Sequence, residues 1–174
     1  MRNIRLLPVI MIMAACCLVF CAGCKESMPA YENVVSSIDN LRDKYGEYLK
    51  TTDDNLTQVS NENAKTKTGT PCSSFYLKSS DGKYECVTLE FEQNNAYMVD
   101  EYMYLSDKAF YITRSFIDPA SMTPVMSRYY VWYNTIYKIN EDNKTLDKTD
   151  ESISSQFYTS FADLVSAYGQ KPAA

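Results

Sequence analysis

The first periodic pattern in the chain runs from Pro29 to Lys50, where apolar residues recur at steps of three and four. Such spacing is typical of an amphipathic helix that buries one face. Ser27 stands where it can cap the first turn, and proline is accepted inside a first turn. We therefore expect an N-terminal helix. Its apolar face consists of Tyr31, Val34, Val35, Ile38, Leu41, Tyr45, Tyr48 and Leu49.

The following segment, residues 51–71, is polar and holds few large apolar residues. A polar stretch between two periodic patterns favours a linker. We expect residues 51–71 to be such a linker, with one short helical turn around residues 54–63.

Apolar and polar residues alternate along most of residues 75–139, which is typical of half-buried strands. The expected turns are Ser80-Asp81-Gly82, Asn94-Asn95, Ser106-Asp107 and a longer loop over 118–124. The last expected strand covers residues 127–139, and residues 140–144 close it. Because short connections favour antiparallel neighbours, the pattern predicts a meander of about five strands.

Helical spacing returns at the C-terminus. The residues that share one face there are Ile153, Phe157, Phe161, Leu164, Val165 and Tyr168. Asp150 or Ser152 can cap the start, and Gly169 and Pro172 stop the helix. The expected fold is therefore α+β, with residues 29–174 as one domain. It has an N-terminal helix, the antiparallel meander, and a C-terminal helix packed on one face of the sheet.

The amino-acid composition limits the kinds of catalytic site, metal site and partner that the protein can have. The 174 residues include no histidine, which excludes Ser-His, Cys-His and histidine–metal sites. With 17 Lys and Arg against 22 Asp and Glu, the formal net charge is −5, which argues against a nucleic-acid partner. Phosphate-loop, nucleophile and zinc-spacing motifs are absent from the sequence. We expect no metal, no cofactor and no enzymatic activity.

The N-terminus has the layout of a secretory signal peptide. Arg2 and Arg5 precede an apolar run over residues 6–20, and small residues follow. The run ends in Cys21-Ala22-Gly23-Cys24, and its last three residues match the lipobox. The segment therefore resembles the signal peptide of bacterial lipoproteins, although Cys21 stands where leucine is more usual.

This resemblance implies that residues 1–23 are removed and that Cys24 carries a diacylglyceryl group. Residues 24–28 then form the lipid anchor and a short tether to a bacterial membrane, on its extracytoplasmic side. Two alternatives stay open, an uncleaved membrane-spanning helix and a signal peptide cleaved elsewhere. The remaining chain has 15 basic and 22 acidic residues. Because an anionic membrane surface repels that net negative charge, the diacylglyceryl group on Cys24, and not electrostatic attraction, would hold the protein at the membrane.

Cys72 and Cys86 are a candidate disulfide, since they are the pair left when Cys24 is acylated. A three-residue loop at 80–82 would pair Tyr76 with Cys86. Cys72 would then lie four residues from alignment, or about 13 Å along the strand. A disulfide bond therefore requires the start of that strand to fold back, and both a bonded and a free Cys72–Cys86 pair stay open. Without histidine, a catalytic cysteine is not expected.

Fifteen tyrosines are an unusual feature, and many fall on expected strands. Alternation along residues 127–139 predicts one face with Tyr129, Val131, Tyr133 and Tyr137 and another with Tyr130, Trp132 and Ile136. One face must pack on the helices, so the other is a candidate aromatic binding surface, with Tyr129, Tyr130, Trp132 and Tyr133 as its site residues. The plain alternative is that tyrosine is simply a good strand former.

Together these patterns predict a membrane-anchored, extracytoplasmic binding module for an apolar ligand or an envelope protein. At fold level it is similar to cystatin-like modules and to half-barrels that carry lipid or lipoproteins. One alternative is a structural or inhibitory envelope lipoprotein that acts through its outer surface. A more remote one is a carboxylate-based hydrolase that uses Glu90 or Asp100. The acidic clusters lack a recognisable catalytic or calcium-binding spacing, so we expect solvated charge there.

Overall fold

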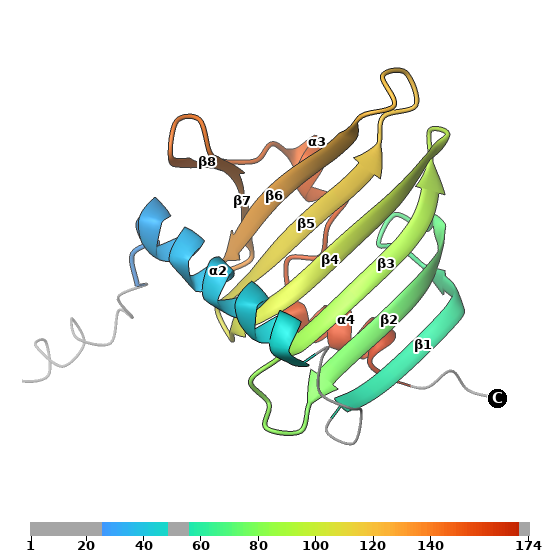
Figure 1. The fold of residues 1–174 in the computed structure, drawn as a ribbon, viewed down its shortest axis with the longest axis horizontal. Coiled ribbons are helices and arrows are strands. Elements are labelled where there is room, and N and C mark those ends of the chain that lie inside the picture. Colours follow the sequence, from blue (N-terminus) through green and yellow to red (C-terminus); the bar gives the residue numbers. More distant parts are fainter. Residues whose placement is uncertain (1–25, 49–55, 171–174) are drawn as a thin grey trace, which may run out of the picture.

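The computed structural model describes residues 26–48 and 56–170, which form one eight-stranded antiparallel sheet flanked by helices (Figure 1). The strands lie in the sheet in the same order as in the chain. They are β1 Leu56–Lys65, β2 Pro71–Ser79, β3 Glu85–Gln93, β4 Ala96–Ser106, β5 Ala109–Ile117, β6 Pro124–Trp132, β7 Thr135–Asn140 and β8 Thr145–Lys148. The α+β class and the antiparallel meander are confirmed, and the expected number of about five strands is too small.

Helix α2, Tyr31–Tyr48, confirms the N-terminal helix, and its buried residues Val34, Ile38 and Leu41 come from the expected apolar face. In Figure 1 it crosses the near face of the sheet, while α3 (Glu151–Ser154) and α4 (Phe161–Tyr168) lie behind the sheet. The expectation that the helices share one face is therefore wrong. The sheet buries side chains on both faces, in one cluster with α2 and another with α4.

Several expected features lie outside the described residues. They are the signal peptide 1–23, the anchor Cys24, the end of the first helix at 49–50, residues 51–55 of the expected linker, and Pro172. None of the described helices is long and apolar enough to span a membrane.

The remainder of the expected linker forms strand β1 and the turn that follows it, so this part of the 51–71 prediction is wrong. β1 pairs only with β2 and is one edge of the sheet. It buries just Val59 and Ala64, because a bulge between Asn61 and Ala64 interrupts its alternation. An edge strand with a bulge tolerates many polar residues, which is why its sequence resembles a linker.

The long strand expected over 127–139 is two strands, β6 and β7, joined at Tyr133 and Asn134. Both turn residues have positive φ, 45° and 63°, as a tight hairpin turn requires. The turn pairs Tyr130 with Tyr137 and Val131 with Ile136. Tyr137 therefore shares the face of Tyr130, and Ile136 shares that of Val131, which corrects the expected assignment of these residues to faces. The expected turn at Asn94-Asn95 is confirmed by the same signature, with φ of 52° and 61°.

The C-terminal helix is also divided. Asp150 caps α3 by accepting from the backbone N–H of Ile153 at 3.0 Å, and Ser160 caps α4 by accepting from that of Asp163 at 3.3 Å. Serine hydroxyls near the end of α3 bond back to backbone carbonyls, which competes with continued helix. Of the expected apolar face, Phe157, Phe161, Leu164 and Tyr168 are buried against the sheet.

The β2–β3 hairpin has a four-residue loop, since the Ser79 N–H donates to the carbonyl of Tyr84 at 2.9 Å. Cys86 therefore faces Leu77 rather than Tyr76, a slip of one residue. The slip puts Cys72 in the cluster under α4 and Cys86 in the cluster under α2. Both thiols are free and buried on opposite faces of the sheet, which corrects the candidate disulfide. Burial raises the pKa of both, that of Cys86 to about 12.

Candidate functional site

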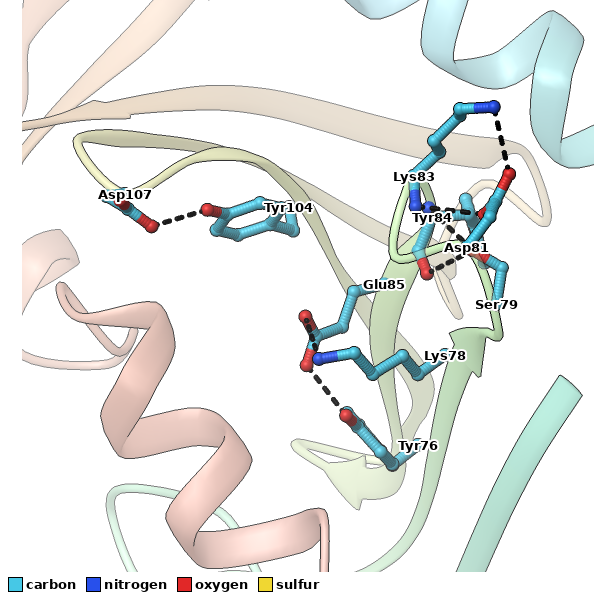
Figure 2. A network of polar contacts seen from close by, with 9 residues as sticks. All are labelled: Tyr76, Lys78, Ser79, Asp81, Lys83, Tyr84, Glu85, Tyr104 and Asp107. Carbon is cyan, nitrogen blue, oxygen red and sulfur yellow. Dashed lines mark hydrogen bonds and ion pairs between the residues drawn. The ribbon is translucent and has the colours of Figure 1, made fainter.

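A cleft of about 620 Å³ opens between α4 and the end of the sheet where β2 and β4 finish and β3 and β5 begin. Several of its side chains are drawn in Figure 2, beside the helix. The cleft is lined by Lys78, Glu85, Tyr104, Ser106, Asp107, Lys108, Phe110, Asn134, Thr159, Ser160, Phe161, Ala162, Val165 and Ser166. One side of it is therefore sheet and turns, and the other is the start of α4 with the residues just before it.

The apolar part of the cleft is a cluster of aromatic rings. The Phe161 ring lies 5.6 Å from that of Phe110 and 5.2 Å from that of Tyr104, measured between centroids. Val165 follows Phe161 by one helical turn and lines the same cleft. Because Phe110 and Phe161 are buried in the core beneath, this part of the cleft rests on a rigid base.

Glu85 is the most enclosed charged group of the cleft. Its residue is 8% exposed, and its carboxylate accepts a hydrogen bond from the Tyr76 hydroxyl at 2.7 Å. Its second oxygen lies 3.3 Å from Nζ of Lys78, the residue opposite it on β2. Burial, followed by the hydrogen bond to the Glu85 carboxylate, raises the pKa of Tyr76, so the Tyr76 hydroxyl stays a neutral donor. Figure 2 shows the Glu85 carboxylate joined through one oxygen to the Tyr76 hydroxyl and through the other to the Lys78 ammonium.

A second polar contact lies at the β4–β5 turn, where polar residues form one edge of the cleft, which we call the rim. The Tyr104 hydroxyl donates to Asp107 at 2.6 Å (Figure 2). That hydrogen bond, followed by burial, raises the pKa of Tyr104 to about 12. The ring of Tyr104 therefore faces the apolar cluster while its neutral hydroxyl is held at the polar rim.

The N-terminal end of the described chain meets this rim. Lys108, the residue after Asp107, lies 2.9 Å from the carboxylate of Glu26 and 5.8 Å from the ring centroid of Tyr133. The contact with Glu26 is the main cause that raises the pKa of Lys108. Glu26 follows Cys24 by two residues, or about 7 Å of extended chain. The segment that enters the domain therefore begins beside the cleft.

Comparison of the chain with protein-family models, curated proteins and solved structures gives no match. The geometry of the cleft and of the surface therefore carries the functional argument.

The structure does not form the expected open aromatic face. Tyr129 is buried under the C-terminal segment, with its ring 4.9 Å from that of Phe157. Tyr130 is buried on the opposite face, in the α2 cluster. Trp132 and Tyr133 are half-buried, with ring centroids 4.9 Å apart. Helices on both faces are the physical reason, since they leave neither aromatic row of β6 open. Only Tyr133 comes near the cleft, through Lys108.

The two carboxylates named for a hydrolase do not converge. Asp100 is 2% exposed on the α4 side and is held by Arg114 with two contacts of 2.7 Å. Glu90 accepts from Tyr97 on the other side of the sheet. Within residues 26–48 and 56–170, no three Cys, Asp or Glu side chains gather as a metal site would require.

None of the residues that line the cleft was predicted as a site residue from the sequence, and Phe161 and Val165 were expected only on the apolar face of the C-terminal helix. Lys78 and Glu85 are cross-strand partners, and their opposite charges are the signal that would have paired them once the hairpin loop was known. Tyr104 lies just before an expected turn and Asp107 lies in it, but neither belongs to a motif. Phe110 and Phe161 are about fifty residues apart, so their contact depends on the tertiary fold.

Proposed function

We propose that the protein is a membrane-anchored, extracytoplasmic binding module that holds a small amphipathic ligand in the cleft without chemical conversion. The observation that carries the proposal is the two-part lining of the cleft. Its apolar base of Phe110, Phe161 and Val165 meets a polar rim with Lys78, Glu85, Asp107 and Lys108. Its volume of about 620 Å³ lies in the ordinary range for small-molecule sites.

The lining favours a particular ligand. An aliphatic or aromatic body of the ligand would cover the partly exposed Tyr104 ring and Val165 above Phe110 and Phe161, and gain stability by removing apolar surface from water. Its polar groups would bond to Lys78 and to the serine hydroxyls of the rim, which already contact water. A purely apolar ligand would take water from the half-exposed Lys78 ammonium without replacing its hydrogen bonds, at a free-energy cost. An amphipathic ligand is therefore the better match.

The path of the chain supports a site close to the membrane. Glu26 is bonded to the cleft rim through Lys108, and the proposed lipid anchor Cys24 precedes it by two residues. If the anchor forms, the rim lies within a short reach of the bilayer, and an amphipathic ligand would have a short path between lipid and cleft.

Labelling with radioactive palmitate tests the anchor. We expect the wild-type chain and Cys21→Ala to incorporate the label, and Cys24→Ala to incorporate none, because only the cysteine after Gly23 matches the modified position. Both variants remove one thiol from the same segment, so they are matched. Equal labelling of Cys24→Ala and the wild type would contradict the anchor.

Native mass spectrometry tests the ligand. The chain from residue 25 to 174, exported without Cys24, is weighed before and after denaturation. We expect an additional small mass that is lost on denaturation, since a cleft that holds a ligand from the envelope should retain part of it during purification. A bare protein mass in every preparation would contradict a carrier role for the cleft.

A further inference from the structure

The face of the sheet that packs on α2 is only half covered. α2 packs over Cys86, Met103 and Tyr111, near the start of β3 and β5 and the end of β4. Figure 1 shows the rest of this face, toward the β3–β4 and β5–β6 turns, with no described helix over it. We call this part the open half.

Four of the five exposed large apolar residues project from the open half. Residues an even number of positions apart on a strand project from the same face. Leu77, Met103, Tyr111 and Tyr130 belong to the α2 cluster, so they show which residues of β2, β4, β5 and β6 project from that face. The four are Phe75 on β2, Tyr97 on β4, Ile117 on β5 and Met126 on β6, which are 40%, 56%, 50% and 53% exposed. The fifth, Met122, lies in the adjoining β5–β6 loop.

The same surface carries negative charge. Glu90 and Glu92 project from β3 and Glu101 from β4, on the face of Cys86 and Met103. Two of these carboxylates are held in place, Glu90 by the Tyr97 hydroxyl at 2.6 Å and Glu101 by the Thr113 hydroxyl at 3.1 Å. Arg128 projects from this face as well, but it is bonded to Glu141 at 2.6 Å.

The strand register brings charge and apolar groups together. Tyr97 is the cross-strand partner of Glu92, and Val99 is that of Glu90. Met126 lies opposite Ser115, two residues before Ile117 on the same face. Apolar side chains of β4 therefore border the carboxylates of β3, and those of β5 and β6 lie farther along the same face. Phe75 lies on the other side of those carboxylates, on β2.

We propose that the open half is a docking surface for a protein segment that carries basic side chains beside apolar ones. Charge complementarity selects this occupant. Exposed apolar groups on one face mark an interaction surface, and the carboxylates would bond to lysine or arginine across it. A second copy would place the same carboxylates against each other, and an anionic bilayer would repel them.

A synthetic ten-residue peptide of alternating lysine and leucine tests the surface, with a glutamate–leucine peptide for comparison. Binding to the exported chain is measured by fluorescence anisotropy. We expect only the lysine peptide to bind, with affinity that falls as salt rises. Tyr97→Ser, and Glu90→Gln together with Glu92→Gln, should each weaken it by about tenfold.

The matched control removes two carboxylates elsewhere, with Glu151→Gln and Asp163→Asn on the α3 and α4 side. It should change the affinity by less than about twofold, as should the cleft variant Ala162→Trp. The proposal is overturned if the lysine peptide does not bind. It is equally overturned if the control weakens binding as much as the Glu90 and Glu92 changes, or if Ala162→Trp abolishes binding.

Discussion

Replacement of Arg114 by methionine is expected to lower the free energy of unfolding by about 3–5 kcal/mol at pH 7. Arg114 holds the buried Asp100 through Nε and Nη2, each at 2.7 Å, and donates from Nη1 to Gln156 at 2.6 Å. Without it, a carboxylate that is 2% exposed remains in an apolar core. Urea denaturation of the variant and the wild type measures the difference.

The effect should depend on pH in a definite direction. Burial already raises the pKa of Asp100, and Arg114 opposes that shift. Loss of Arg114 raises the pKa further, so the folded variant binds the proton more tightly than the unfolded chain does. Since the unfolded state is the same for both proteins, the loss of stability is smaller at low pH, where Asp100 is protonated in both folded proteins. It grows as the pH rises above the raised pKa of Asp100 in the wild type.

Two comparisons separate this effect from a general loss of arginine. Arg128→Met breaks a pair whose side chains are 33% and 59% exposed, and should cost about 0–1 kcal/mol. The double variant Asp100→Leu with Arg114→Met should recover most of the stability, because no charge is left buried. Equal losses for Arg114→Met and Arg128→Met would show that Asp100 is not enclosed.

Phe157→Ala is the second large effect, with an expected loss of about 3–5 kcal/mol. The Phe157 ring is fully buried between the sheet and the C-terminal segment. Its centroid lies 4.9 Å from that of Tyr129, and the Arg114 guanidinium carbon lies 4.2 Å from it. The substitution opens a cavity and removes the cation–π contact.

Phe75→Ala is the matched control, since the same side chain is removed from a strand position that is 40% exposed. We expect a loss of about 1 kcal/mol or less there, measured by the same denaturation. If Phe157→Ala costs no more than Phe75→Ala, the segment between α3 and α4 does not seal the core.

Periodicity located the elements that make local contacts. α2 follows directly from the three- and four-residue spacing of Val34, Ile38 and Leu41. The Asn94-Asn95 turn follows from the tolerance of asparagine for positive φ. These features depend on a few neighbouring residues, so the sequence is sufficient for them.

Features that depend on strand register or on residues far apart in the chain could not be predicted from the sequence. The Tyr133-Asn134 turn is concealed because tyrosine is a strand former, and missing it reversed the faces of Tyr137 and Ile136. One extra loop residue between Ser79 and Tyr84 separated Cys72 from Cys86. Because the side-chain period of a strand is two, each one-residue error moves a whole set of residues to the other face.

The candidate site also depends on tertiary contacts that local sequence patterns do not contain. The expected aromatic surface assumed one uncovered face, and α2 on one side with α4 on the other buried Tyr130 and Tyr129. Four exposed apolar side chains remain at the open half, away from the expected residues. The cleft needs the pairing of Lys78 with Glu85 and the approach of α4 to β5, which no local pattern contains.

Two alanines of α4 provide the most direct test of ligand binding in the cleft. Ala162 and Ala167 are both exposed on the same helix, and only Ala162 lines the cleft. Native mass spectrometry of Ala162→Trp and Ala167→Trp measures the fraction of protein that retains the small ligand. Occupancy of the cleft predicts that Ala162→Trp loses the ligand mass while Ala167→Trp keeps it at the wild-type level. Equal retention by the two variants would contradict it.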